Sequence, residues 1–185
     1  MRSPSTAALA VLALALAALP AALAAQEDEH VVEARSVVSR SAVRPGETFK
    51  AAVVLRIRPG FHINDPAPLD EFMVPTALTV ASGQGFEALE VAFPPSRRAR
   101  FSYAEGELAV YDGEIVVGIL LRAGEKLAPG PVTVKAALSY QACDEETCLP
   151  PMDLAVDIAV TVSSDGGAET HAEIFDKLRF KSPKK

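Results

Sequence analysis

The chain contains two cysteines, Cys143 and Cys148, and four residues separate them. Two thiols at this spacing can form a disulfide if they face each other across the mouth of a hairpin, because paired strands bring Cα atoms to roughly 5.5 Å. Such a bond is either a structural bridge or a dithiol that opens and closes during electron transfer. The spacing alone is compatible with both functions.

The energetics of so short a loop favour the redox alternative. In the chain-entropy model, a disulfide that closes this loop contributes roughly 2 kcal/mol, which is near the low end for disulfides. A bridge that holds a domain together gains more by joining distant segments, as the inter-sheet bridge of immunoglobulin domains does. A small local loop can also open and close without disturbing the fold.

The loop between the cysteines is acidic, with Asp144, Glu145 and Glu146 in succession. Nearby carboxylates disfavour the thiolate that exchange chemistry requires. We therefore expect a dithiol that a partner protein must activate, rather than a freely reactive thiol.

The three histidines, His30, His62 and His171, offer weaker chemistry. None of them is accompanied by the motifs of a Ser/His/Asp site. His62 could complete a metal site with the two cysteines, but the spacing of these residues is not diagnostic of one. We expect no metal and no cofactor, and a metal-handling domain is kept as an alternative.

Residues 1–25 have the plan of a cleavable secretory signal. Arg2 is followed by an apolar run over residues 7–19 and then by small residues that suit cleavage. Removal of the signal leaves about 160 residues, enough for one domain with its own core. Export exposes the cysteines to an oxidising compartment, which favours a disulfide over zinc. The net charge of −6 argues against nucleic acid as a partner.

Short stretches of alternating apolar and polar residues occupy most of residues 26–163, which we assign to one domain. Asp112-Gly113 separates two apolar runs and is typical of a hairpin turn. Eight or nine short strands with turns between them predict an all-β, antiparallel β-sandwich. The stretches read as strands are 31–38, 48–58, 76–81, 86–93, 108–111, 114–122, 132–139 and 154–162, and those read as loops are 65–75 and 94–98.

Residues 164–185 differ in character from the sandwich. A flexible break is followed by a pattern over residues 168–180 that places Ile174, Phe175 and Leu178 on one helical face. We expect a short C-terminal helix that packs on the sandwich and ends in a solvated basic tail. The alternative is a tail that docks on an acidic partner or membrane surface.

The cysteine segment resembles the active-site segment of a known family. Residues 140–151 read Tyr-Gln-Ala-Cys-x4-Cys-Leu-Pro-Pro, similar to the N-terminal periplasmic domain of the thiol:disulfide interchange protein DsbD. Gly-Phe-His-Ile-Asn at residues 60–64 and Leu-Ala-Val-Tyr-Asp-Gly-Glu at residues 108–114 resemble further signatures of that family, in the same order. The resemblance extends over residues 31–162.

This resemblance implies a periplasmic, immunoglobulin-like domain that relays electrons by thiol–disulfide exchange. The donor would be a thioredoxin-like protein or a membrane thiol transporter, and the recipients would be periplasmic thiol–disulfide proteins, including those of cytochrome c biogenesis. Cys148 would form the mixed disulfides with partners, and Cys143 would resolve them. In that family an aromatic loop covers the pair, which points to Phe101 with Tyr103. The other residues implied to line the site are Phe61, His62, Tyr140 and Gln141.

Two departures from the family limit what can be transferred. The loop between the cysteines is acidic and is shorter than in some members. DsbD also continues into a membrane domain and a thioredoxin-like domain, whereas this sequence ends at Lys185. We therefore expect the electron donor to be another polypeptide and expect no stable membrane insertion after signal cleavage. The main alternative function is a secreted binding module in which the disulfide only pins a hairpin.

Overall fold

The structure, a computed structural model, describes residues 30–181, which form eleven strands and one short helix. The residues of the expected signal lie outside this range. The elements are β1 Val32–Val38, β2 Thr48–Ile57, β3 His62–Asn64, β4 Ala77–Val80, β5 Phe86–Ala92, β6 Arg97–Arg100, β7 Glu107–Tyr111, β8 Glu114–Ala123, β9 Gly130–Tyr140, β10 Ala142–Cys143, β11 Met152–Val162 and α1 Ala172–Phe175.

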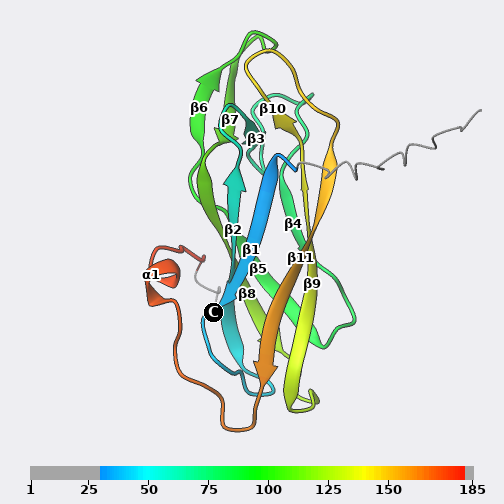
Figure 1. The fold of residues 1–185 in the computed structure, drawn as a ribbon, viewed down its shortest axis with the longest axis vertical. Helices are drawn as coiled ribbons and strands as arrows, with labels where there is room; N and C mark the ends of the chain where they lie inside the picture. Colours follow the sequence, from blue (N-terminus) through cyan, green and yellow to red (C-terminus); the bar gives the residue numbers. More distant parts are fainter. Residues whose placement is uncertain (1–29, 182–185) are drawn as a thin grey trace, which may run out of the picture.

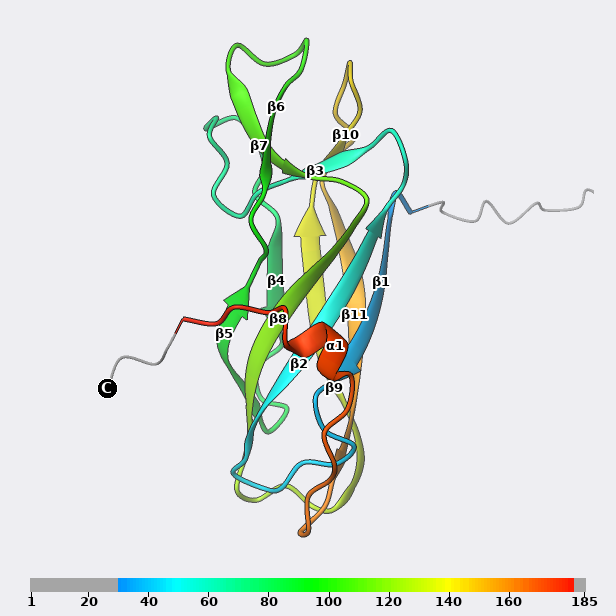
Figure 2. The same cartoon turned by 90° about the vertical axis from the view of Figure 1, so that its left-hand side faces the viewer.

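These strands form three antiparallel sheets (Figure 1). The main sheet has the order β1-β2-β8-β5, and the three-stranded sheet β11-β9-β4 packs against it. A small sheet with the order β10-β3-β7-β6, called the end sheet below, lies at one end of the molecule (Figure 2). The predicted all-β, immunoglobulin-like sandwich with a short C-terminal helix is confirmed.

The core lies between the two larger sheets, because alternate side chains of their strands point inward. Residues of β9 and β11 follow this alternation, and the even-numbered residues are buried from Val134 to Tyr140 and from Val156 to Val162. The fully buried core side chains include Leu55, Ile119, Leu121, Leu138 and Ile158.

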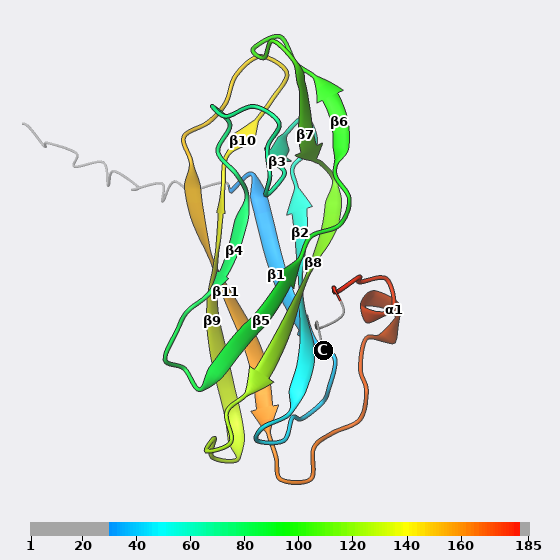
Figure 3. The same cartoon turned by 180° about the vertical axis from the view of Figure 1, so that it is seen from behind.

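The ladder between β9 and β11 positions the cysteine segment. Its register is unbroken from the pair Gly130–Val162 at one end to Tyr140–Met152 at the other. Residues 141–151 therefore project from the end of a rigid ribbon, and β10 joins them to the end sheet. Figure 3 shows β10 at the same end of the molecule as β3 and β7.

The prediction of a hairpin at Asp112-Gly113 is wrong. β7 pairs with β3 and β6, whereas β8 pairs with β2 and β5, so the two strands belong to different sheets. Gly113 adopts a φ of 64°, and its carbonyl accepts a 2.8 Å hydrogen bond from the backbone N–H of Ile57. The glycine thus allows a bend that leads the chain from the end sheet into the main sheet.

The segment read as an extended loop at residues 94–98 contains the start of a strand. β6 pairs along its whole length with β7, from Arg97–Val110 to Arg100–Glu107. Its residues are mostly exposed, which is why the strand has no apolar alternation to reveal it. Arg97 also forms an ion pair with Asp112 across this edge of the end sheet.

The C-terminal helix is shorter than the predicted pattern over residues 168–180. Only Ala172–Phe175 is helical, because the preceding residues are bound to the sandwich: Glu169 forms a β-bridge with Arg40. The side chain of Phe175 is buried, as the helical pattern predicted. The chain then continues across the outer face of the main sheet, where α1 lies in Figure 2.

A glycine in β8 makes room for this C-terminal segment. A Cβ atom at Gly118 would lie 2.8 Å from Cζ of Phe180 and 2.9 Å from Cδ1 of Leu178. Ala52, the ladder partner of Gly118, is buried although it points away from the core. The C-terminal segment therefore covers the outer face of β2 and β8, which explains why β2 is buried on both faces.

Candidate functional site

The two cysteines face each other in a small hairpin at the end of the molecule. Cys143 and Cys148 form an isolated antiparallel bridge, and their sulfur atoms are bonded at 2.02 Å. Their Cα atoms are 4.0 Å apart, closer than predicted. The pair lies between the hydrogen bonds Leu149 N–H to Ala142 O and Asp144 N–H to Thr147 O, where opposed residues approach most closely.

This hairpin is held by hydrogen bonds of its own. One carboxylate oxygen of Asp144 accepts bonds of 2.8 Å from the backbone N–H groups of Glu146 and Thr147. These bonds lower the pKa of Asp144. At the base of the hairpin, the side-chain amide of Gln141 donates to the carbonyl of Leu149. These hydrogen bonds thus hold the conformation of the hairpin in addition to the disulfide.

The two cysteines differ in access to solvent. Cys143 is fully buried, whereas Cys148 is partly exposed. An incoming thiolate must reach the sulfur that it attacks, so the geometry makes Cys148 the accessible end of the bond.

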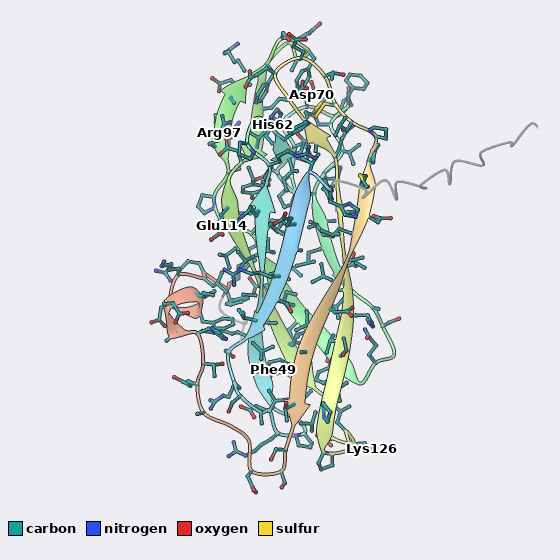
Figure 4. All side chains as sticks on the ribbon, viewed as in Figure 1. Phe49, His62, Asp70, Arg97, Glu114 and Lys126 are labelled. Carbon is teal, nitrogen blue, oxygen red and sulfur yellow. A yellow bond between two sulfur atoms is a disulfide. The ribbon has the colours of Figure 1, made fainter. Side chains whose placement is uncertain are left out.

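An aromatic stack lies beside the cysteine pair. His62 on β3 is the ladder partner of Cys143, and its ring stacks on Phe101 with centroids 4.0 Å apart. Tyr103 stacks on Phe101 at 5.5 Å, and its hydroxyl lies 2.7 Å from Nε2 of His62. Figure 4 shows His62 at the end of the molecule that carries the end sheet. We call these three residues the aromatic stack.

The aromatic stack is made of uncharged groups at neutral pH. Burial lowers the pKa of His62 to about 4, with a further lowering by Arg97 that Asp112 and Asp144 partly oppose. Burial also raises the pKa of Tyr103 to about 12, assisted by Glu145 and Asp144. The hydrogen bond between His62 and Tyr103 therefore joins a neutral imidazole to a protonated phenol.

The lowered pKa of His62 predicts a loss of stability in acid. The unfolded chain binds a proton at His62 near pH 6.5, whereas the folded chain does so only near pH 4. The free energy of unfolding should therefore fall as the pH decreases between these values. The variant His62→Gln, whose amide can still bond to Tyr103, should lack this part of the slope. Denaturant titrations across this range measure it, and equal slopes in the two proteins would contradict it.

The loop that carries Phe101 and Tyr103 is tied to the cysteine hairpin. The hydroxyl of Ser102 donates a 2.9 Å hydrogen bond to the carbonyl of Glu145, between the two cysteines in sequence. Phe101 is 7% exposed and packs with the buried side chains of Leu108 and Val110. The loop is thus fixed both to β7 and to the hairpin.

Two of the predicted lining residues lie away from the aromatic stack. Tyr140 is 1% exposed and packs in the main core, and its burial raises the pKa of its hydroxyl. Phe61 packs at the edge of that core, with the guanidinium of Arg58 5.4 Å from its ring centroid. The structure brings together His62, Phe101 and Tyr103, with Gln141 at the base of the hairpin.

Sequence reasoning missed two residues that hold the site. Ser102 makes the bond that joins the two loops, and Met73 packs against the cluster of Phe101, Leu108 and Val110. Both lie in irregular segments, where apolar periodicity gives no signal. The only local signal for Ser102 is its place between Phe101 and Tyr103, the two residues expected to cover the pair.

Among residues 30–181 no group of three or more His, Cys, Asp or Glu side chains is arranged to hold a metal ion. Within the same range, no helix is both long and apolar enough to cross a membrane.

The chain is an immunoglobulin-like sandwich that carries a disulfide at one end, beside a stack of aromatic side chains. The chain belongs to the family described as the N-terminal domain of the thiol:disulfide interchange protein DsbD, whose sequence profile matches residues 28–159. It is therefore a thiol–disulfide interchange domain by family. A comparison with curated proteins found no match.

Among solved structures, the chain is similar to the N-terminal periplasmic domain of ScsB from Proteus mirabilis. The identity is 13%, the TM-score is 0.53, and the match covers 81% of this chain but 53% of that one. The chain thus spans about half the length of this relative. At this low identity the match supports the fold alone. Two further matches have TM-scores of 0.29 and carry no argument. One, 11% identical over 69% of this chain and 88% of the other, is AvmM, which catalyses macrocyclization in alchivemycin A biosynthesis. The other, 9% identical over 72% of this chain and 28% of the other, is a family 123 glycoside hydrolase from Clostridium perfringens.

Proposed function

We propose that this domain relays electrons by thiol–disulfide exchange at Cys143 and Cys148. The observation that carries the proposal is the unequal exposure of the two cysteines, one fully buried and one partly exposed, in a hairpin that its own hydrogen bonds hold. The family of the chain supports the same chemistry.

The exchange proceeds in balanced steps. A donor thiolate attacks Sγ of Cys148, the disulfide breaks, and Cys143 leaves as a thiolate that takes up a proton. The second thiol of the donor then attacks the donor sulfur that is bonded to Cys148, so the donor forms its own disulfide and Cys148 is released. The domain has now gained two electrons and two protons. It passes them on when the Cys148 thiolate attacks a recipient disulfide and Cys143 resolves the resulting mixed disulfide.

The aromatic stack acts as a cover in this mechanism. Phe101 and Tyr103 belong to a loop bound to the cysteine hairpin through Ser102, and His62 stands opposite Cys143 in the ladder. The cover shields the bond from small thiols until a partner displaces it. Gln141 supports the base of the cysteine hairpin through its hydrogen bond to Leu149, whereas Phe61 and Tyr140 pack in the main core.

We place the domain in the periplasm, exported by a signal at residues 1–25. Its donor is a thioredoxin-like protein or a membrane thiol transporter, and its recipients are periplasmic thiol–disulfide proteins, those of cytochrome c biogenesis included. The sandwich occupies residues 26–163 and the break, helix and basic tail occupy residues 164–185. The N-terminal periplasmic domain of ScsB, which has the same fold, supports this location.

The reduction potential of the pair tests this proposal. Structural disulfides of secreted proteins have potentials below about −300 mV, whereas exchanging ones lie higher. We expect a value above about −300 mV, measured by equilibrating the protein with reduced and oxidised dithiols and trapping the thiols with an alkylating reagent. A lower value would identify a structural bridge and favour the binding-module alternative.

A further inference from the structure

The loop between β3 and β4 displays an aromatic side chain in a defined conformation. Phe72 is 82% exposed, the highest value among the large hydrophobic residues that are exposed in the described part of the chain. Its backbone N–H donates a 2.9 Å hydrogen bond to the side chain of Asp70, and the next N–H bonds to the backbone carbonyl of Asp70. The turn thus fixes the position from which Phe72 points into solvent.

The same loop is anchored to the strands of the end sheet. The amide of Asn64, the last residue of β3, donates to the carbonyl of Val74 at 3.0 Å. The carboxylate of Asp65 accepts a 3.1 Å hydrogen bond from the hydroxyl of Tyr111 on β7. Figure 4 places Asp70 at the same end of the molecule as His62, whereas Lys126 lies at the opposite end. Phe72 is therefore displayed on the end that carries the disulfide.

Met73 connects this loop to the cover of the dithiol. It packs against Phe101, Leu108 and Val110, the cluster that seats the aromatic stack. A protein that binds Phe72 therefore binds next to Met73, the residue that supports the cover. A second exposed apolar residue, Leu69 at 48% exposure, lies in the same loop. Ordered, exposed apolar residues at the end of a domain that carries its reactive site are typical of protein-binding surfaces.

The charge around the dithiol indicates the kind of partner. Glu145 and Glu146 are exposed at the tip of the cysteine hairpin, and the only other charged residue between the cysteines is Asp144. Glu71 beside Phe72 and Glu105 in the loop of the cover are also exposed. Of the exposed arginines on β6, Arg97 is paired with Asp112 and Arg100 with Glu107, so the acidic side chains dominate the charge of this end. A partner with a basic surface would be attracted to it, and one with an acidic surface would be repelled.

We propose that the β3–β4 loop is the docking element for the redox partner: Phe72 enters an apolar pocket beside the reactive cysteine of a thiol–disulfide protein whose surrounding surface is basic. This inference rests on the proposed function, because it concerns the partner of the same dithiol. It adds a contact that the sequence resemblance does not indicate.

The test compares exchange rates of the full chain with a protein dithiol and with a small one. The protein probe is a reduced thioredoxin-fold protein in two versions, with lysines or with glutamates around its reactive cysteine, and dithiothreitol is the small probe. We expect the basic version to react faster, and added salt to reduce the difference. Phe72→Ser should slow the reaction with the basic version about tenfold, as loss of an interface hot spot does.

Two controls separate docking from general damage. Phe72→Ser should leave the rate with dithiothreitol unchanged, because the disulfide and its cover are untouched. Leu89→Ser removes another exposed apolar residue, 39% exposed on β5 of the main sheet, and should change neither rate. This pattern would support the proposal.

Three results would overturn the docking proposal. If Phe72→Ser and the wild type exchange with the basic protein at equal rates, Phe72 has no docking role, and the proposed function stays intact. Self-association of the wild type that Phe72→Ser abolishes, seen by sedimentation, would assign the loop to a second copy of the chain. Failure of both protein probes to react with the wild type, while dithiothreitol does, would refute the proposed function and the docking role together.

Discussion

The Cys148→Ser variant is expected to lose all exchange with protein dithiols, whereas Cys143→Ser is expected to stop at a covalent complex. Cys148 is the partly exposed cysteine, so its removal leaves only the buried Cys143, which a partner cannot reach. Cys143→Ser retains the accessible thiol but cannot resolve the mixed disulfide that forms. Non-reducing electrophoresis and intact mass measure both outcomes after mixing with a thioredoxin-fold protein that keeps only its reactive cysteine, activated as a mixed disulfide with a small aromatic thiol, because this partner has no second thiol that could release Cys148.

Both variants should remain folded, which makes the comparison fair. The disulfide closes a loop with a sequence separation of 5 and contributes only about 2 kcal/mol. The hairpin also keeps the hydrogen bonds that Asp144 and Gln141 make. Far-UV circular dichroism provides the check on folding. A covalent adduct with Cys148→Ser but none with Cys143→Ser would reverse the roles that we assign to the two cysteines.

The Phe101→Ala variant should be reduced by dithiothreitol at least about tenfold faster than the wild type. Phe101 stacks on both His62 and Tyr103, whose own rings are nearly parallel, lie with centroids 6.4 Å apart and are joined by a hydrogen bond. Its loss removes the ring that covers both of them and exposes the bond, because access limits thiol attack on a shielded disulfide. Quenching the reaction with an alkylating reagent at short times measures the rate.

A matched variant in the main core distinguishes uncovering from destabilisation. Phe49 is 3% exposed and packs edge-on against Phe86 far from the disulfide. Phe→Ala changes at buried sites cost about 3–5 kcal/mol, so both variants lose stability. Only Phe101→Ala should react faster under conditions where both are folded. The same acceleration in Phe49→Ala would mean that reduction proceeds through global unfolding rather than through removal of the cover.

The sequence was most informative where its patterns are local. The alternation along residues 154–162 predicts a strand with one buried face, and β11 has this form. The residues that resemble the DsbD family identified the fold and the family, both confirmed. His62, Phe101 and Tyr103, which the resemblance also indicated, lie together in the structure as one stack.

What the sequence did not predict depends on contacts between distant segments. Asp112-Gly113 has the composition of a hairpin turn, yet pairing of β7 with β3 and of β8 with β2 turns it into a bend between sheets. Tyr140 adjoins the cysteine segment but points into the core, because it ends the inward-facing series of β9. The bond from Ser102 to Glu145 spans 43 residues, and no local pattern encodes such a contact.

The local nature of the disulfide has a thermodynamic consequence. In a closed cycle, the difference in unfolding free energy between the oxidised and reduced forms equals the difference in reduction potential between the folded and unfolded chains. A loop-closure contribution of about 2 kcal/mol corresponds to about 40 mV, since 1.4 kcal/mol is equivalent to about 30 mV for two electrons. Loop closure by itself thus moves the potential of the folded chain only slightly from that of the free Cys-x4-Cys peptide. Evolution of the covering rings can then change the speed of electron transfer while its driving force stays almost constant.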